Sequence, residues 1–140
     1  MLPIRDVTDL IPQKFPFVMI DQLEYSADAI TISSLVVRES NLFVEGGFLR
    51  EPGLIENIAQ TAAARAGYAA SLQNDRTPLG FIGAIKDLEI YELPAIGAKL
   101  ETEIKFVNQI FDVAIIFGTV RCAEKVMCQC EMKIVINQQN

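Results

Sequence analysis

The sequence predicts an α+β domain in which a curved antiparallel sheet is wrapped around one long central helix. Three observations lead to this class: a hairpin pattern in the first third of the chain, an alanine-rich helical pattern in the middle, and a meander of strands after it. One helix cannot cover both faces of such a sheet, so the remaining apolar surface is expected to be buried in a partner chain. Residues 1–140 are expected to form a single domain.

The first part of the chain reads as a turn followed by a hairpin. A short helical turn is expected after Thr8 or Asp9, ended by Pro12. Apolar and β-branched residues over 18–25 and 29–37, separated by a turn at 26–28, predict two paired strands.

The central helix is expected over residues 54–72, after the break made by Pro52 and Gly53. Alanines are strong helix formers, and apolar residues recur at the three- and four-residue spacing of one helix face. That face comprises Leu54, Ile55, Ile58, Ala59, Ala62, Ala66 and Ala70. It narrows to small side chains, including Gly67, which allow close approach to another backbone, so a buried central helix is predicted.

The second half of the chain is expected to be β throughout. Four stretches are predicted as strands: residues 80–91 as one long or broken strand, then 99–107, 113–120 and 126–136, with turns at 94–97 and near 123–125. Charged and apolar side chains alternate from Lys99 to Val107, which is typical of a strand with one solvated face. Residues 137–140 read as a frayed tail.

The composition of the chain bears on whether it is a membrane protein, an oligomer or a nucleic-acid-binding protein. The hydrophobic fraction of 51% and mean hydropathy of +0.28 fit either a membrane protein or an oligomer. No uncharged stretch is longer than nine residues, whereas a membrane-spanning helix needs about 20. The N-terminus also lacks the layout of a signal peptide, so a cytoplasmic oligomer is expected. The net charge of −6, with only 12 Lys and Arg residues, does not fit a nucleic-acid-binding protein.

The three cysteines and the absence of histidine bear on metal binding. Cys122, Cys128 and Cys130 have neither the spacing of a zinc site nor that of a redox pair. Cys128 and Cys130 would lie on one face of a strand as small hydrophobic residues. Because the sequence contains no histidine, no transition-metal site is expected.

Three segments resemble a known family. Residues 10–21, Leu-Ile-Pro-Gln-Lys-Phe-Pro-Phe followed by apolar residues and Asp21, resemble the opening Leu-Pro-His-Arg-Tyr-Pro-Phe motif of the β-hydroxyacyl-(acyl carrier protein) dehydratases. These are hotdog-fold enzymes of fatty-acid synthesis. Residues 56–60, Glu-Asn-Ile-Ala-Gln, are similar to the Glu-Ala-x-Ala-Gln of that family, and residues 124–132 resemble its final hairpin. The resemblance implies a hotdog fold over nearly the whole chain.

The resemblance also implies a site, carried over position by position. In the family a histidine removes a C2 proton, a helix carboxylate of the other protomer assists loss of the hydroxyl, and a loop amide holds the thioester carbonyl. The carboxylate matches Glu56 and the histidine matches Gln13. The loop matches residues 45–48, with Gly46 and Gly47 as candidates for the carbonyl-binding amide, although its Pro-Gly is replaced by Leu49-Arg50 and the chain after it is shorter. Phe17 and Gln60 are candidate substrate contacts.

Each candidate also has a structural alternative. Glu56 is either an acid or base with a pKa raised by burial, or a carboxylate stabilised by the helix dipole or bonded to Gln60. Gln13 does not titrate and so cannot be the general base, but its amide can orient a carbonyl or a water. Gly46 and Gly47 either supply an oxyanion amide or only turn the chain. Gln60 either contacts substrate or satisfies the backbone and Glu56 in the core.

Three basic residues are candidate contacts for a phosphopantetheine arm or a carrier protein. These are Arg50, Arg65 and Lys86, for which solvated surface charge is the alternative. A substrate arm of this kind would travel with the carrier, so no protein-bound cofactor is expected.

Three functions follow from the resemblance. The first is a dehydratase-like lyase that binds a 3-hydroxyacyl thioester of acyl carrier protein or coenzyme A, in fatty-acid or a specialised lipid or polyene synthesis. Its missing base requires either that Glu56 shuttles both protons or that a histidine-bearing homologue completes a heterodimer. The second is an acyl thioesterase that uses Glu56 and Gln13. The third is a non-catalytic subunit of a heteromeric dehydratase. The expected assembly is a homodimer, a higher oligomer, or such a heterodimer.

Overall fold

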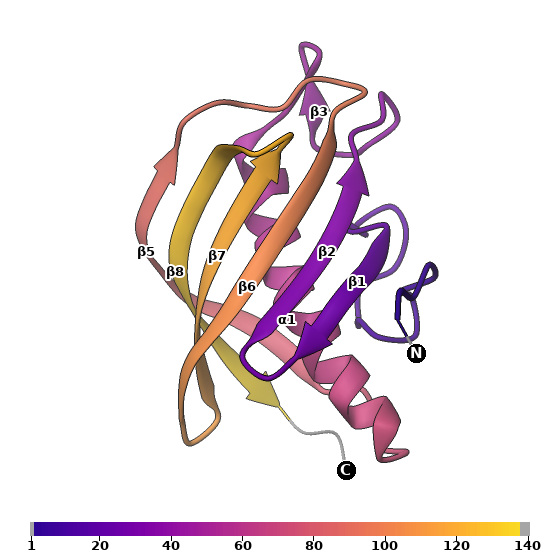
Figure 1. Ribbon diagram of the computed structural model, residues 1–140, viewed down its shortest axis with the longest axis vertical. Helices are drawn as coiled ribbons and strands as arrows, with labels where there is room; N and C mark the ends of the chain where they lie inside the picture. Colours follow the sequence, from indigo (N-terminus) through magenta and orange to yellow (C-terminus); the bar gives the residue numbers. More distant parts are fainter. Residues whose placement is uncertain (1, 138–140) are drawn as a thin grey trace.

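A computed structural model describes residues 2–137 and shows a six-stranded antiparallel sheet curved around one helix (Figure 1). The elements follow in the order β1 (Gln22–Ala27), β2 (Ile30–Val36), β3 (Val44–Glu45), β4 (Phe48–Leu49), α1 (Glu51–Leu72), β5 (Leu79–Ile90), β6 (Lys99–Ile110), β7 (Val113–Cys122) and β8 (Lys125–Asn137). The α+β class and the hotdog arrangement predicted from the sequence are confirmed.

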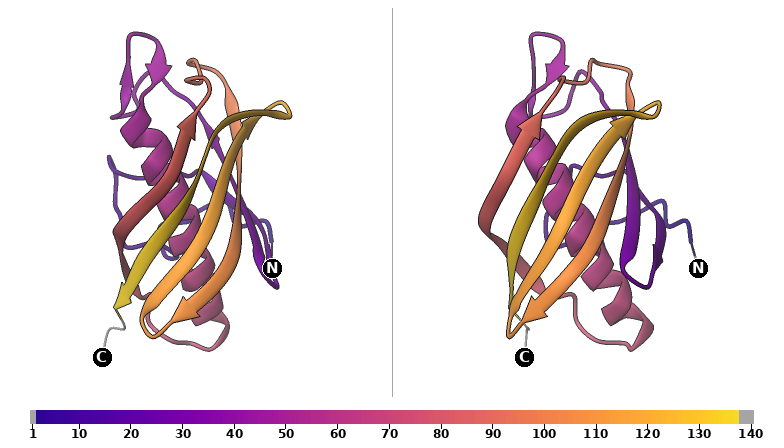
Figure 2. Two further views of the ribbon diagram at one scale, coloured as in Figure 1. Left: turned by 90° about the vertical axis from the view of Figure 1, so that its left-hand side faces the viewer. Right: turned by 60° about the vertical axis from the view of Figure 1, so that its left-hand side comes forward.

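The two halves of the chain meet within one sheet. Its strand order is β1-β2-β6-β7-β8-β5, so β2 of the first hairpin pairs with β6 of the later meander. Strands β3 and β4 form a separate two-stranded hairpin just before the helix. The views in Figure 2 show α1 lying along the hollow of the curved sheet. As predicted, β5 is long and broken, with register shifts between Ile82 and Ala84 and between Lys86 and Glu89.

The helix begins three residues earlier than the sequence predicted. It runs from Glu51, with Pro52 in its first turn, and ends at Leu72. Proline fits this position because its missing N–H would have no partner within the first turn of a helix. The residues taken as a break are therefore part of the helix itself.

The N-terminal segment lies against the side of the helix that the sheet leaves uncovered. Predicted strand residues 18–21 precede β1 and bind the helix instead: the Met19 N–H donates to Gln60 Oε1 at 2.6 Å, and Asn57 Nδ2 donates to the Met19 carbonyl at 2.9 Å. The predicted helical turn near Thr8 is a run of turns, and the hairpin turn lies at Asp28 and Ala29, two residues later than expected.

A close contact fixes this segment on the helix. A Cβ placed on Gly67 would lie 1.9 Å from the Leu10 carbonyl oxygen. The predicted close approach of the small-residue face to another backbone is confirmed here, and the neighbouring backbone is that of the N-terminal segment.

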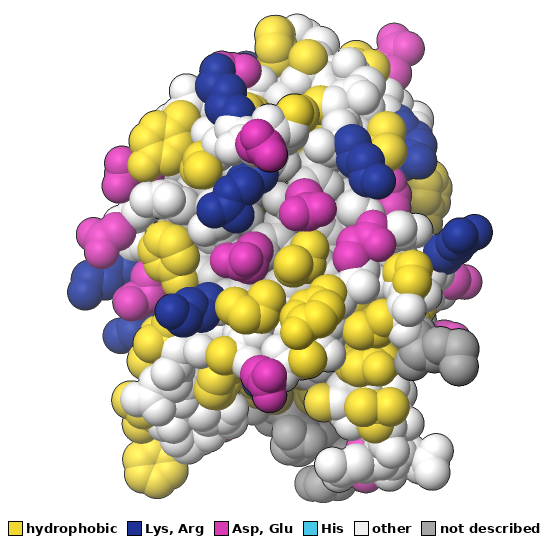
Figure 3. Space-filling view, in the orientation of Figure 1, with side chains coloured by type: hydrophobic (Ala, Val, Ile, Leu, Met, Phe, Trp, Pro, Cys, Tyr) yellow, Lys and Arg dark blue, Asp and Glu magenta, His cyan; other side chains and the backbone are white. Residues whose placement is uncertain are grey.

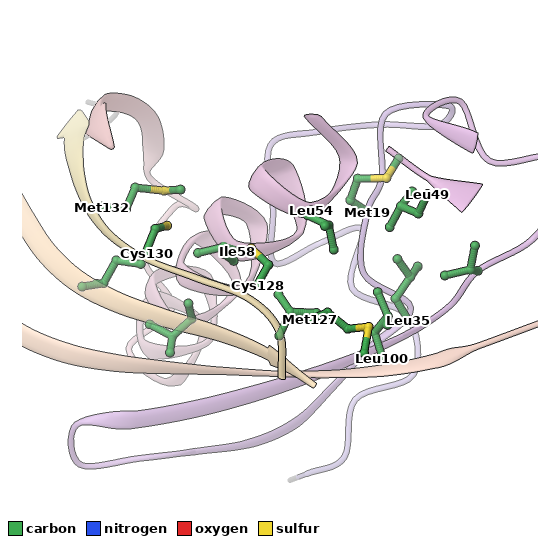
Figure 4. Close-up of a cluster of buried hydrophobic side chains, with 14 of the residues drawn as sticks. Met19, Leu35, Leu49, Leu54, Ile58, Leu100, Met127, Cys128, Cys130 and Met132 are labelled. Carbon is green, nitrogen blue, oxygen red and sulfur yellow. The ribbon is translucent and has the colours of Figure 1, made fainter. Parts of the chain in front are cut away.

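The main core lies between α1 and the sheet (Figure 4). Leu54 and Ile58 of the helix meet Ile104, Ile116 and Met132 of the sheet. As predicted, two of the cysteines are part of this core, because alternate residues of a strand share one face. Burial, with a smaller effect of Cys130, raises the pKa of Cys128 to about 12, and burial raises that of Cys130 to about 11, so both thiols stay neutral.

Strand β5, at one edge of the sheet, carries exposed apolar side chains. Strand β5 pairs only with β8, and Phe81, Ile85 and Leu88 are 56%, 38% and 38% exposed. On the face seen in Figure 3, hydrophobic side chains gather in the lower half. Among the described residues, no helix is long and apolar enough to cross a membrane.

Candidate active site

A pocket of about 410 Å³ lies between α1 and the part of the sheet near the turn that joins β6 to β7. Its walls are mostly apolar: Ala59, Ala62, Ala63 and Ala66 from the helix, and Phe106, Ile116, Ile134 and Ile136 from the sheet. The small helix side chains leave the space that larger ones would fill. Three polar side chains line the same pocket, namely Gln13, Glu56 and Arg65. Two of these three are the residues that the sequence placed at the centre of the site.

Glu56 lies in the second turn of α1 and is half-buried. One of its carboxylate oxygens accepts a hydrogen bond of 3.0 Å from Gln60 Nε2, one turn further along the helix. Gln60 Nε2 also donates to the Phe17 carbonyl at 2.8 Å, and Gln60 Oε1 accepts from the Met19 N–H. Gln60 is therefore fully occupied in holding Glu56 and the N-terminal segment.

Gln13 presents an unusual group to the pocket. Its side-chain oxygen is buried and has no hydrogen-bond partner within residues 2–137. An unpaired buried amide oxygen is costly, about 1–3 kcal/mol, unless a ligand or water supplies a donor. This is a site that can accept a hydrogen bond from a bound molecule.

Gln13 and Glu56 share the pocket without a hydrogen bond between them. No hydrogen bond within the described chain joins them, and the Glu56 carboxylate turns to Gln60. The N-terminal segment runs antiparallel to the helix, with Leu10 against Gly67 and Phe17 at Gln60. Gln13 thus belongs to the stretch that lies beyond Gln60, toward the C-terminal end of α1.

The predicted substrate contacts Gly46, Gly47 and Phe17 lie outside this pocket. Gly46 and Gly47, with φ of 63° and 87°, form the turn between β3 and β4, and the Gly47 carbonyl accepts a hydrogen bond from the Ile96 N–H. Both are absent from the pocket walls, as is Phe17, whose side chain is 55% exposed. In this single chain the two glycines turn the backbone, and a role in binding the carbonyl stays a prediction.

The three basic candidates have different surroundings. Arg50 is exposed and forms an ion pair with Glu51, and Lys86 is exposed on β5. Arg65 instead lines the pocket, with its guanidinium 4.4 Å from the centre of the Phe106 ring. Sequence reasoning named Arg65 as a contact for a phosphopantetheine arm or carrier protein, or else as surface charge. It could not place Arg65 in the pocket, because its position opposite Phe106 depends on a strand some 40 residues further along the chain. Within residues 2–137, no group of His, Cys, Asp and Glu side chains is arranged to hold a metal ion.

Comparison with known proteins identifies the family. The family model described as ApeP-like, ApeP dehydratase, matches residues 5–140. The chain belongs to the ApeP-like dehydratase family. The resemblance that the two sequence motifs predicted is confirmed at this level.

Two relatives of this ApeP-like chain are named 3-hydroxyacyl-[acyl-carrier-protein] dehydratase FabZ. The protein from Clostridium kluyveri is 24% identical over 140 residues, covering 98% of this chain and 97% of its own length. The protein from Halalkalibacterium halodurans is 30% identical over 113 residues, covering 77% and 79%.

Solved structures agree on the fold. The dehydratase heterocomplex ApeI:P from Xenorhabdus doucetiae matches with a TM-score of 0.86 at 20% identity, covering 100% of this chain and 93% of that one. A hypothetical thioesterase with coenzyme A from Streptococcus pneumoniae matches with a TM-score of 0.67 at 12% identity, covering 84% and 90%. At these identities the ApeP-like chain shares the hotdog fold with both.

Proposed function

We propose that this chain is a subunit of a heteromeric dehydratase that binds 3-hydroxyacyl thioesters of an acyl carrier protein. It contributes the apolar pocket and the Glu56 carboxylate, while a histidine-bearing homologous chain contributes the base. The pathway is a cytoplasmic synthesis of fatty acids or of a related specialised lipid.

The observation that carries this proposal is the combination of groups in one pocket. A carboxylate and an amide with an unpaired oxygen face a mostly apolar cavity, in a chain that contains no histidine. The cavity suits an acyl chain, and the amide oxygen suits a donor on that chain, such as the 3-hydroxyl. Gln13 can accept a hydrogen bond but cannot remove a proton from carbon, so the base must be another group.

Dehydration of a 3-hydroxyacyl thioester moves two protons. The base removes a proton from C2, the electron pair forms the C2–C3 double bond, and the hydroxyl leaves C3 as water after taking a proton from an acid. Glu56 is assigned to the acid, and Gln60 orients its carboxyl group through the 3.0 Å hydrogen bond. Gln13 is assigned to positioning the hydroxyl through its free oxygen.

The position of the pocket supports a partner chain. Phe81 and Ile82 belong both to the pocket wall and to the edge strand β5, which has no strand partner on its outer side among the described residues. A chain that pairs with β5 would therefore lie next to the pocket. The family of this chain and the heterocomplex of similar fold from Xenorhabdus doucetiae support a histidine-bearing dehydratase as that chain.

A thioesterase is the second candidate, favoured by the presence of Glu56 and Gln13 in one histidine-free pocket. In that mechanism the carboxylate would activate a water held by the amide oxygen, and the acyl group would pass from sulfur to the water. The lack of a hydrogen bond between the two side chains within one chain counts against this use.

One assay separates the two. The purified chain, the histidine-bearing homologue and their mixture are each incubated with a 3-hydroxyacyl carrier protein, and both enoyl product and free thiol are measured. We expect a stable complex, enoyl product whose formation by the complex depends on Glu56, and no free thiol above background. Free thiol released by this chain alone would establish the thioesterase instead.

Glu56→Gln is the critical variant, because it keeps a hydrogen-bonding side chain and removes the acid. We expect the complex that carries it to lose at least 100-fold in turnover, the usual contribution of general acid catalysis being about 10²–10⁴-fold. Glu51→Gln is the matched control, since Glu51 is a partly exposed carboxylate on the same helix that does not line the pocket. Full activity of the Glu56→Gln complex would disprove the catalytic role of this chain.

A further inference from the structure

The third polar residue of the pocket, Arg65, has no role in the proposed reaction. Its guanidinium lies over the Phe106 ring at 4.4 Å and lines the pocket beside Ala62 and Ala66. None of the salt bridges within residues 2–137 involves it. Desolvation lowers the pKa of this guanidinium, in agreement with its partly buried position.

Stacking on an aromatic ring satisfies only one side of a guanidinium. The contact with Phe106 engages the flat face of the group, whereas its N–H donors point outward in the plane. These donors form a fork that fits the two oxygens of a carboxylate. The pocket wall holds one carboxylate, Glu56, which already accepts from Gln60, and the single amide oxygen of Gln13. A bound molecule is therefore the natural source of a paired acceptor.

The distance along the helix from Glu56 to Arg65 indicates which part of the substrate could supply this acceptor. Arg65 follows Glu56 by nine residues, or about 13 Å along a helix that rises about 1.5 Å per residue. A thioester bound with its reacting carbons at Glu56 would place a group far from its carbonyl near Arg65. The mostly apolar wall there fits the end of an acyl chain better than a polar pantetheine arm.

We propose that Arg65 selects acyl chains that end in a carboxylate, by binding that group with its guanidinium while Phe106 holds the guanidinium in place. This inference rests on the proposed acyl pocket and adds to it a class of substrate. The net charge of −6 repels anions in general, so a preference for an anionic chain would have to come from a local group such as Arg65.

The test measures binding with ligands that cannot react. Two pantetheine thioethers of equal chain length, one ending in a methyl group and one in a carboxylate, are titrated into the full-length protein in complex with its histidine-bearing homologue. We expect the carboxylate ligand to bind about fivefold more tightly, since a charged hydrogen bond is favourable but the guanidinium is partly solvated. The preference should weaken as salt is added.

Variants assign the preference to the residue. Arg65→Gln should abolish it, and Arg65→Lys should keep part of it because the charge remains without the fork. The control Arg38→Gln, which changes an exposed arginine outside the pocket, should leave it intact. Equal binding of the two ligands by the unaltered protein, or a preference that survives Arg65→Gln, would overturn the inference while the acyl pocket stands. If neither ligand binds, the proposed function and this inference both fail.

Discussion

Gly67→Ala is the sharpest test of how the pocket is built. Alanine is favoured over glycine within a helix by about 1 kcal/mol, so an unconstrained site would gain stability from this change. Here the new Cβ would lie 1.9 Å from the Leu10 carbonyl oxygen and 2.7 Å from its carbon, which are backbone atoms that cannot rotate away. The N-terminal segment would have to move.

The structure gives the size of the effect. Forcing extra volume into a well-packed contact costs about 1–3 kcal/mol, and the close backbone contact puts Gly67 at the upper end of that range. Subtracting the gain of about 1 kcal/mol in helix propensity leaves a net loss of about 2 kcal/mol. Displacement of the segment would also move Gln13, so ligand binding in the pocket should weaken in the same variant.

Urea unfolding measures the change in the free energy of unfolding. One protein concentration is used throughout, because the stability of any oligomer depends on concentration. Ala69→Gly is the matched control: Ala69 is exposed on the same helix, so this change should cost about 1 kcal/mol through propensity alone. Alanine would then be the better residue at 69 and the worse one at 67. A Gly67→Ala protein that is about 1 kcal/mol more stable would refute the contact with Leu10.

Four further outcomes are expected. Gln60→Leu should cost about 2–4 kcal/mol, measured by urea unfolding, because it strands two backbone groups and frees the carboxylate that the amide holds. In the folded protein a maleimide should modify Cys122 but not the buried Cys128 and Cys130, whose pKa values are raised to about 12 and about 11. Unfolded thiols ionise near the ordinary pKa of 9.0 while these two stay protonated, so stability should fall above pH 9 by up to about 1.4 kcal/mol per unit for each thiol. Gly47→Ala should cost about 1–2 kcal/mol in the same unfolding assay, because alanine disfavours a φ of 87°.

Controls for these changes lie elsewhere in the chain. Gln73→Leu alters an exposed glutamine and should leave stability within about 0.5 kcal/mol. Modification of all three thiols at the same rate would contradict the burial of the cysteines. Gly97→Ala carries a similar cost, since Gly97 has a φ of 93°, and a loss of turnover confined to Gly47→Ala would point to a carbonyl-binding amide at Gly47.

Periodicity was enough to predict the helix and the strands of the large sheet, but not the short strands β3 and β4. The ends of two predicted elements also depend on contacts that no local pattern contains. Residues 18–20 have the composition of a strand, yet the Met19 backbone bonds to Asn57 and Gln60, some 40 residues away. The helix start was missed because Pro52 was read as a break, although a first-turn proline is compatible with a helix.

Some residues of the site could also be predicted from the sequence, and others could not. Gln13 and Glu56 could be placed from the motifs, and the structure brings both to one pocket. Arg65 could not be placed, because its role depends on Phe106, which only the fold brings opposite the helix. The hydrogen bonds of Gln60 were predicted as the structural alternative, since a buried amide between Glu56 and the backbone needs partners for both of its ends.

The polar groups in the pocket bear on whether one chain can carry out the whole dehydration. Dehydration needs a group that takes the C2 proton and a group that delivers a proton to the leaving hydroxyl. Glu56 is the only carboxylate in the lining of the described pocket, and its bond to Gln60 fixes it at one place on the helix. Gln13 does not titrate, so in the proposed reaction the base is a group brought in from outside this pocket unless Glu56 moves both protons. The strand edge at Phe81 and Ile82, where the pocket wall meets the sheet boundary, is where a second chain would bring it.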